Sequence, residues 1–178
     1  MIMNSCSKHN TLSIGHRGAK GYVAENTFES ISKAIELDVD GIEIDVFKCA
    51  SGELVLFHDK DLKELTGKSG LIENLTIKEL EEFLVLEKYK IPTLKDVLIK
   101  IESPLFVNIE LKGLNTAQAT SKIITDISKS SSWSLENFLV SSFNWNELEQ
   151  FRSIDKNTPV GVLVSKSMSI NEAIEFGK

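Results

Sequence analysis

The chain has 178 residues, of which 42% are hydrophobic and 26% are charged. This composition is typical of one soluble globular domain with a sizeable core, and it excludes a disordered chain. The formal net charge of −6 excludes the basic surface that nucleic-acid binders usually carry, so we expect no nucleic-acid partner.

Residues 1–10 are expected to form a flexible N-terminal tail. They lack the basic segment and the long apolar segment of a signal peptide. No run in the chain approaches the ~18 apolar residues that a membrane span needs. The two cysteines, Cys6 and Cys49, form no CxxC pattern, which favours free thiols in a reducing compartment. A cytoplasmic location is therefore expected.

Six short apolar runs, rich in β-branched residues, predict strands. They cover 11–15, 41–47, 53–57, 105–111, 138–143 and 160–164. Helix starts between them are indicated by a capping residue followed three positions later by Glu. These pairs are Asn26 with Glu29, Thr76 with Glu79, Asn144 with Glu147, and Ser169 with Glu172. Strands that alternate with amphipathic helices predict an α/β fold with a parallel sheet, in a single domain over 1–178.

The strand GIEIDVF carries two carboxylates on one side. Glu43 and Asp45 are two residues apart, so they project together, while Ile42 and Ile44 take the opposite side. Both faces of an α/β sheet are normally covered, and buried carboxylates there need partners. An exposed edge strand could also carry them at no cost, and this stretch alone does not decide between the two readings.

Three other predicted strands also end in charged or titratable side chains. His16 and Arg17 follow the first strand, His58 follows the third, and Glu110 and Lys112 share one side at the end of the fourth. The carboxyl ends of parallel strands form one face, where active sites collect. We therefore expect these side chains to meet at one site, although unrelated strand ends remain the simple structural alternative.

The residue types at these strand ends suit phosphodiester chemistry. Carboxylate oxygens are hard ligands that favour Ca²⁺ or Mg²⁺. Arg17 and Lys112 would complement a phosphate, and the histidines could act as general base and general acid near neutral pH. A bound metal would stabilise charge that develops on the phosphoryl oxygens.

Several short motifs occur in an order and at a spacing that resemble a known family. They are HRG at 16–18, ENT at 25–27, E-x-D at 43–45, HD at 58–59, IPTL at 91–94 and E-x-K at 110–112. From Leu12 onward the chain resembles the glycerophosphodiester phosphodiesterases. The resemblance implies a TIM (β/α)8 barrel and hydrolysis of a small-molecule glycerophosphodiester to glycerol 3-phosphate and an alcohol.

The resemblance also implies roles by matching position. The acid/base pair would be His16 and His58, the ligands of one divalent cation (Ca²⁺ or Mg²⁺) would be Glu43, Asp45 and Glu110, and the phosphate contacts would be Arg17 and Lys112. It further implies attack on phosphorus by the substrate's own glycerol hydroxyl, giving a cyclic phosphate that water opens. Glu25 and Asn26 of the ENT element are expected to shape the first loop.

The length departs from that family. A TIM barrel has eight strands and about 250 residues. With six predicted strands, the chain is expected to hold about the first six βα units and to stop before the last two. An open barrel exposes strand edges, so a homo-oligomer that covers the edge is possible. Two alternatives stay open: a catalytically silent remnant that binds metal or phosphate, and a related phosphodiesterase that acts on lysophospholipids.

Overall fold

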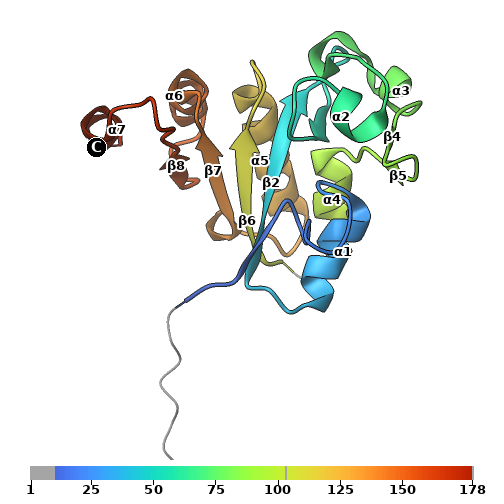
Figure 1. Ribbon diagram of the computed structural model, residues 1–178. Coiled ribbons are helices and arrows are strands. Elements are labelled where there is room, and N and C mark those ends of the chain that lie inside the picture. The colour runs from blue at the N-terminus through green and yellow to red at the C-terminus, as the bar shows by residue number, and fades with distance from the viewer. Residues whose placement is uncertain (1–10, 103, 178) are drawn as a thin grey trace, which may run out of the picture.

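A computed structural model describes residues 11–102 and 104–177 (Figure 1). The expected N-terminal tail and Cys6 lie outside these residues. The elements run β1 (Ile14–His16), α1 (Phe28–Glu36), β2 (Gly41–Lys48), β3 (Leu54–Leu56), α2 (Lys63–Thr66), η1 (Ile72–Asn74), α3 (Ile77–Leu80), β4 (Leu84–Val85), β5 (Tyr89–Lys90), α4 (Leu94–Lys100), β6 (Phe106–Leu111), α5 (Ala117–Ser130), η2 (Leu135–Asn137), β7 (Phe138–Ser142), α6 (Trp145–Ile154), β8 (Val160–Val162) and α7 (Ile170–Phe176).

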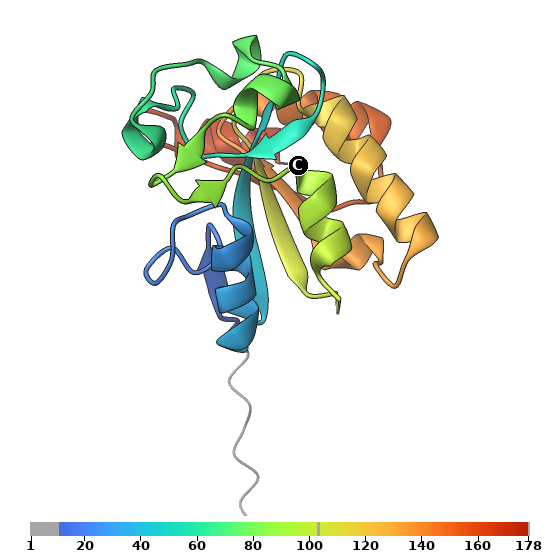
Figure 2. The same cartoon turned by 90° about the vertical axis from the view of Figure 1, so that its right-hand side faces the viewer.

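The main sheet has the strand order β1-β2-β6-β7-β8, and each of these neighbours pairs in parallel. Helices connect these strands, and Figure 2 shows α1, α4 and α5 along one face of the sheet. The small elements α2, α3, β4 and β5 gather at the end of the sheet where β2 ends (Figure 1). The predicted α/β class with a parallel sheet is confirmed, and the arrangement is that of a partial barrel.

The direction of β3 differs from the prediction. The run 53–57 was expected among the parallel strands, but β3 pairs antiparallel with β2, with Val46 opposite Leu56 and Lys48 opposite Leu54. The physical reason is the length of the connection, because a turn of a few residues can join only antiparallel neighbours, whereas a parallel crossover needs a dozen or more. The described residues therefore contain five parallel strands rather than six.

Two of the four predicted helix starts are confirmed. Thr76 caps α3 and forms the expected reciprocal box with Glu79. Ser169 caps α7 by accepting a hydrogen bond from the backbone of Glu172. The longest helix in the described part of the chain, α5, has 14 residues, and no helix there is long and apolar enough to cross a bilayer.

At the other two predicted helix starts, the predicted capping pair does not form. The cap of α1 is Thr27, which exchanges hydrogen bonds with Ser30, while Asn26 lies one residue earlier with φ of 54°. Asn144 precedes α6 but its side chain makes no capping hydrogen bond. The carboxylate of Glu147 is instead bonded to the segment that begins α5.

The core has two parts. The larger one lies between the sheet and its helices and includes Ile42, Ile44 and Val46, all fully buried on the side of β2 opposite the carboxylates. The smaller one lies under the 58–92 segment and is built around Phe57 and Leu62. β2 contributes Ile42, Ile44 and Val46 to the larger part and Phe47 to the smaller one, so both parts hold the strand that carries Glu43 and Asp45.

The turn after β1 leaves no room for a side chain at Gly18. Its φ is +75°, and a Cβ there would lie 2.5 Å from Ser30 Oγ and 2.9 Å from the nitrogen of Ile31 on α1. Gly18→Ala is therefore expected to destabilise the fold by about 1–3 kcal/mol. Thermal unfolding measures the change.

Gly21→Ala is the matched control for this prediction. Gly21 lies in the same loop, and an added Cβ there would meet nothing within 4 Å. Its melting temperature should stay close to that of the wild type. Equal melting temperatures for the two variants would contradict the tight packing of the turn against α1.

Candidate active site and metal centre

Three carboxylates meet on one face of the sheet. The parallel pairing of β2 with β6 sets Asp45 directly opposite Glu110. Strand alternation places Glu43 on the same side of β2 as Asp45, and oxygens of the three groups lie within 4.8 Å of one another. Because β2 runs between β1 and β6, the reading of these residues as part of an exposed edge strand is wrong.

The environment of the site disfavours the ionised forms of Glu43 and Glu110. Burial, together with the nearby charge of Asp45, raises the pKa of Glu43 to about 7. Burial likewise raises the pKa of Glu110, although the charge of Lys112 opposes the shift. Asp45 is almost wholly buried at 1% exposure. Three crowded oxygen donors of this kind fit a hard divalent cation, which would relieve their repulsion.

Arg17 bridges the carboxylates and the first loop. Its φ is 52°, and its backbone nitrogen donates to Glu43 Oε2 at 3.0 Å. The guanidinium Nη1 lies 2.6 Å from Glu25 Oε1, and Nε lies 3.4 Å from Asp45 Oδ2. Nε is buried and has no hydrogen-bond partner of good geometry among the described residues. The side chain is thus held by acids on two sides.

Asn26 holds Asp45 in place, which the sequence analysis did not anticipate. Its Nδ2 donates to Asp45 Oδ2 at 2.9 Å, and its Oδ1 accepts from the backbone nitrogen of Asp45 at 3.3 Å. Its own backbone nitrogen donates to the carbonyl of Arg17. The ENT match was the only sequence signal for this role, and it suggested loop shape alone.

His58 reaches the carboxylates because β3 runs back along β2. The backbone nitrogen of Phe57 donates to the carbonyl of Asp45 at 3.1 Å. His58 Nδ1 lies 2.8 Å from Asp59 Oδ1, and Nε2 lies 3.2 Å from Lys112 Nζ. An ammonium group only donates, so Nε2 accepts from Lys112 while Nδ1–H donates to Asp59. Asp59, the second residue of the HD motif, is therefore also part of the site, although the motif alone indicated no role for it.

Lys112 and His16 complete the constellation. Lys112 Nζ lies 3.2 Å from Glu110 Oε1 and 4.0 Å from Asp45 Oδ1. His16 Nε2 lies 3.7 Å from Glu43 Oε2, and its side chain is 57% exposed. Partial burial and the charges of nearby Lys20 and Arg17 lower the pKa of His16. The structure thus links all the sequence-predicted residues through successive contacts.

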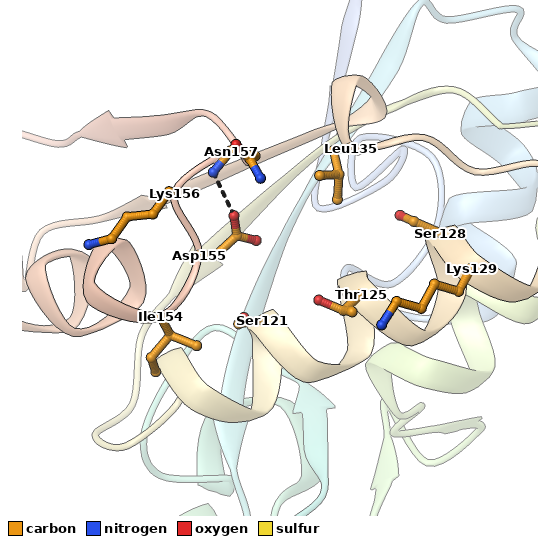
Figure 3. Close-up of a pocket in the computed structure, with 9 residues that line it drawn as sticks. All are labelled: Ser121, Thr125, Ser128, Lys129, Leu135, Ile154, Asp155, Lys156 and Asn157. Carbon is orange, nitrogen blue, oxygen red and sulfur yellow. Dashed lines mark hydrogen bonds between the residues drawn. The ribbon is translucent and has the colours of Figure 1, made fainter.

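A separate hollow is lined by residues of helices and of a connecting loop rather than of the sheet (Figure 3). It has a volume of about 380 Å³ and lies between α5 and the connection from α6 to β8. Ser121 and Thr125 line one wall, and Asp155 on the other accepts from the backbone of Asn157. None of the predicted site residues lines this hollow, so it is distinct from the carboxylate site.

Comparison with known proteins places the chain in the family that the motifs suggested. The family model of the glycerophosphoryl diester phosphodiesterase family matches residues 16–173. A glycerophosphodiester phosphodiesterase of Caldanaerobacter subterraneus is 31% identical over 162 residues, which cover 86% of this chain and 66% of that protein. The chain spans just under two thirds of the length of two curated relatives that it matches.

Solved structures agree with this assignment. A glycerophosphodiester phosphodiesterase from Thermotoga maritima superposes with a TM-score of 0.76 at 35% identity, over 94% of this chain and 69% of that one. A phosphodiesterase from Oleispira antarctica, solved with the product sn-glycerol 3-phosphate, gives 0.79 at 28% identity, over 93% and 71%. This chain belongs to the glycerophosphoryl diester phosphodiesterase family.

Proposed function

We propose that this chain hydrolyses glycerophosphodiesters to glycerol 3-phosphate and an alcohol, with one divalent cation, Ca²⁺ or Mg²⁺, held by Glu43, Asp45 and Glu110. The observation that carries the proposal is that these three carboxylates lie within 4.8 Å of one another, beside a lysine that contacts both Glu110 and His58. The bound cation would supply charge stabilisation to the phosphoryl oxygens.

Lys112 and Arg17 are proposed to bind the phosphate. Lys112 Nζ has three donors and stands between His58 and the carboxylates, so a phosphate oxygen that enters there would meet a fixed positive charge. Arg17 would add the positive charge of its guanidinium, which lies beside Glu25 and Asp45 at the edge of the carboxylate site. The sn-glycerol 3-phosphate bound in the Oleispira antarctica relative supports a phosphate ligand for this fold.

His16 and His58 are proposed to act as the general base and the general acid of the reaction. One imidazole takes the proton from the attacking glycerol hydroxyl, and the other gives a proton to the oxygen of the leaving alcohol. Asp59 holds His58 Nδ1, which leaves Nε2 as the atom that exchanges the proton. The lowered pKa of His16 favours a neutral ring near pH 7. The attack gives a cyclic phosphate, which water then opens.

The metal assignment predicts a change in stability that needs no turnover. Addition of Mg²⁺ or Ca²⁺ should raise the melting temperature, since a ligand at 100 times its Kd stabilises the folded state by about 2.7 kcal/mol. Asp45→Asn and Glu43→Gln should abolish the rise, and metal-free Glu43→Gln should melt no lower than wild type because it removes a crowded charge. Differential scanning calorimetry measures both effects.

Glu36→Gln is the control for the metal prediction. Glu36 lies on α1, away from the site, and its side chain is 69% exposed. Its response to the metal should equal that of the wild type. If neither Mg²⁺ nor Ca²⁺ changes the melting temperature of the wild-type protein, the assignment of the three carboxylates as ligands is contradicted.

The activity is tested by release of glycerol 3-phosphate from a panel of glycerophosphodiesters, with and without EDTA. EDTA should suppress the release. His58→Ala and His16→Ala should each lower the rate by about 10²–10⁴-fold, because each removes a proton-transfer group. Both variants should keep the metal-induced rise in melting temperature.

Wild-type rates in either histidine variant would overturn the acid/base assignment. A wild-type protein that binds metal but releases no glycerol 3-phosphate would instead favour the silent remnant as its function. Release from lysophospholipids alone would favour the lipid-directed alternative.

A further inference from the structure

The chain turns sharply directly after Lys112. The backbone nitrogens of Lys112 and Gly113 both donate to the carbonyl of Val46, at 3.1 and 3.4 Å. Two residues later Asn115 has a φ of +58°, and α5 begins at Ala117. The short turn 113–117 therefore directly follows Lys112, whose own backbone is anchored to β2.

Glu147 holds this turn from the neighbouring helix α6. Its carboxylate accepts from the backbone nitrogens of Asn115 at 2.7 Å, Thr116 at 2.9 Å and Ala117 at 3.0 Å, and from Thr116 Oγ1 at 3.0 Å. Thr116 is the N-cap residue of α5 but makes no side-chain capping bond of its own. From outside the helix, Glu147 thus satisfies two of the free donors at the start of α5, those of Thr116 and Ala117.

A second carboxylate, from η1, holds the same turn. Glu73 Oε1 accepts from the backbone nitrogen of Leu114 at 3.2 Å, and Glu73 Oε2 lies 2.8 Å from Lys60 Nζ. Four successive backbone donors, those of residues 114–117, therefore end on two acidic side chains. Glu147 is the deeper of the two, at 2% exposure.

We propose that Glu147 is a positioning residue that sets where the ammonium group of Lys112 lies, and thereby how tightly a phosphate group is bound. In the described part of the chain Glu147 forms no hydrogen bond or ion pair with the site residues, and it acts through the backbone of the turn 113–117. In Glu147→Gln, the side-chain NH₂ group would face backbone N–H groups that need an acceptor, so hydrogen bonds would be lost and the turn would loosen. The effect on phosphate affinity rests on the proposed function, whereas the effect of Glu147 on the backbone of the turn does not.

A double-mutant cycle tests whether Glu147 acts through Lys112. The dissociation constant of glycerol 3-phosphate is measured by calorimetry, with Mg²⁺ present, for Glu147→Gln alone, Lys112→Met alone and both together. Glu147→Gln should weaken binding about 10-fold in the wild-type background and less than about twofold in the Lys112→Met background. The same loss in both backgrounds would overturn the proposal.

Glu149→Gln is the matched control. Glu149 lies two residues further along α6 and is exposed, so its replacement changes the same charge on the same helix. It should leave the dissociation constant unchanged. If Glu147→Gln does not fold, Thr116→Val removes one of the four bonds and should shift binding in the same direction by a smaller factor, with the same cycle applied.

Amide hydrogen exchange separates this inference from the proposed function. Glu147→Gln should speed exchange at 112–117 at least ~10-fold without any ligand, while Glu149→Gln should not. A wild-type protein that binds no glycerol 3-phosphate would contradict the proposed phosphate site, and the exchange rates would still report on the turn. Unchanged exchange at 112–117 in Glu147→Gln would overturn the positioning role.

Discussion

The parallel pairing of β2 with β6 is the constraint on which the rest of the site depends. Its register sets Asp45 opposite Glu110, and strand alternation adds Glu43 on the same face. Burial, together with the nearby charge of Asp45, raises the pKa of Glu43 to about 7, so the ionised form of this carboxyl group is disfavoured. The fold tolerates it because the other face of β2 is fully buried by Ile42 and Ile44, which leaves the strand no alternative register.

The surrounding residues offset the unfavourable charges without removing them. Arg17 and Lys112 bring two cations to the three acids, and Asn26 satisfies Asp45 with two hydrogen bonds. A structural ion-pair cluster would be expected to balance its charges, since buried unpaired charge is costly. Here Arg17 also forms an ion pair with Glu25, so four acidic side chains share the two cations Arg17 and Lys112. That excess is what a divalent cation would neutralise, and it connects the sheet register to the proposed chemistry.

Sequence patterns located the strand ends well because side-chain alternation and apolar runs are local properties. The faces of Glu43 and Asp45, and the meeting of His58 with Lys112, followed from such patterns and from the family motifs. The predicted direction of β3 was wrong because the prediction considered its apolar run and not the short turn between β2 and β3. The partner of Glu147 could not be predicted, because a contact between α6 and the start of α5 depends on how two helices pack rather than on local spacing.

A crystal structure of the protein grown with CaCl₂ and glycerol 3-phosphate would test the central claim most directly. The account predicts one ion at about 2.3–2.6 Å from an oxygen of each of Glu43, Asp45 and Glu110, as calcium requires. The phosphate should lie against Lys112, within hydrogen-bond distance of Nζ. An ion bound elsewhere, or a phosphate that avoids Lys112, would contradict the account.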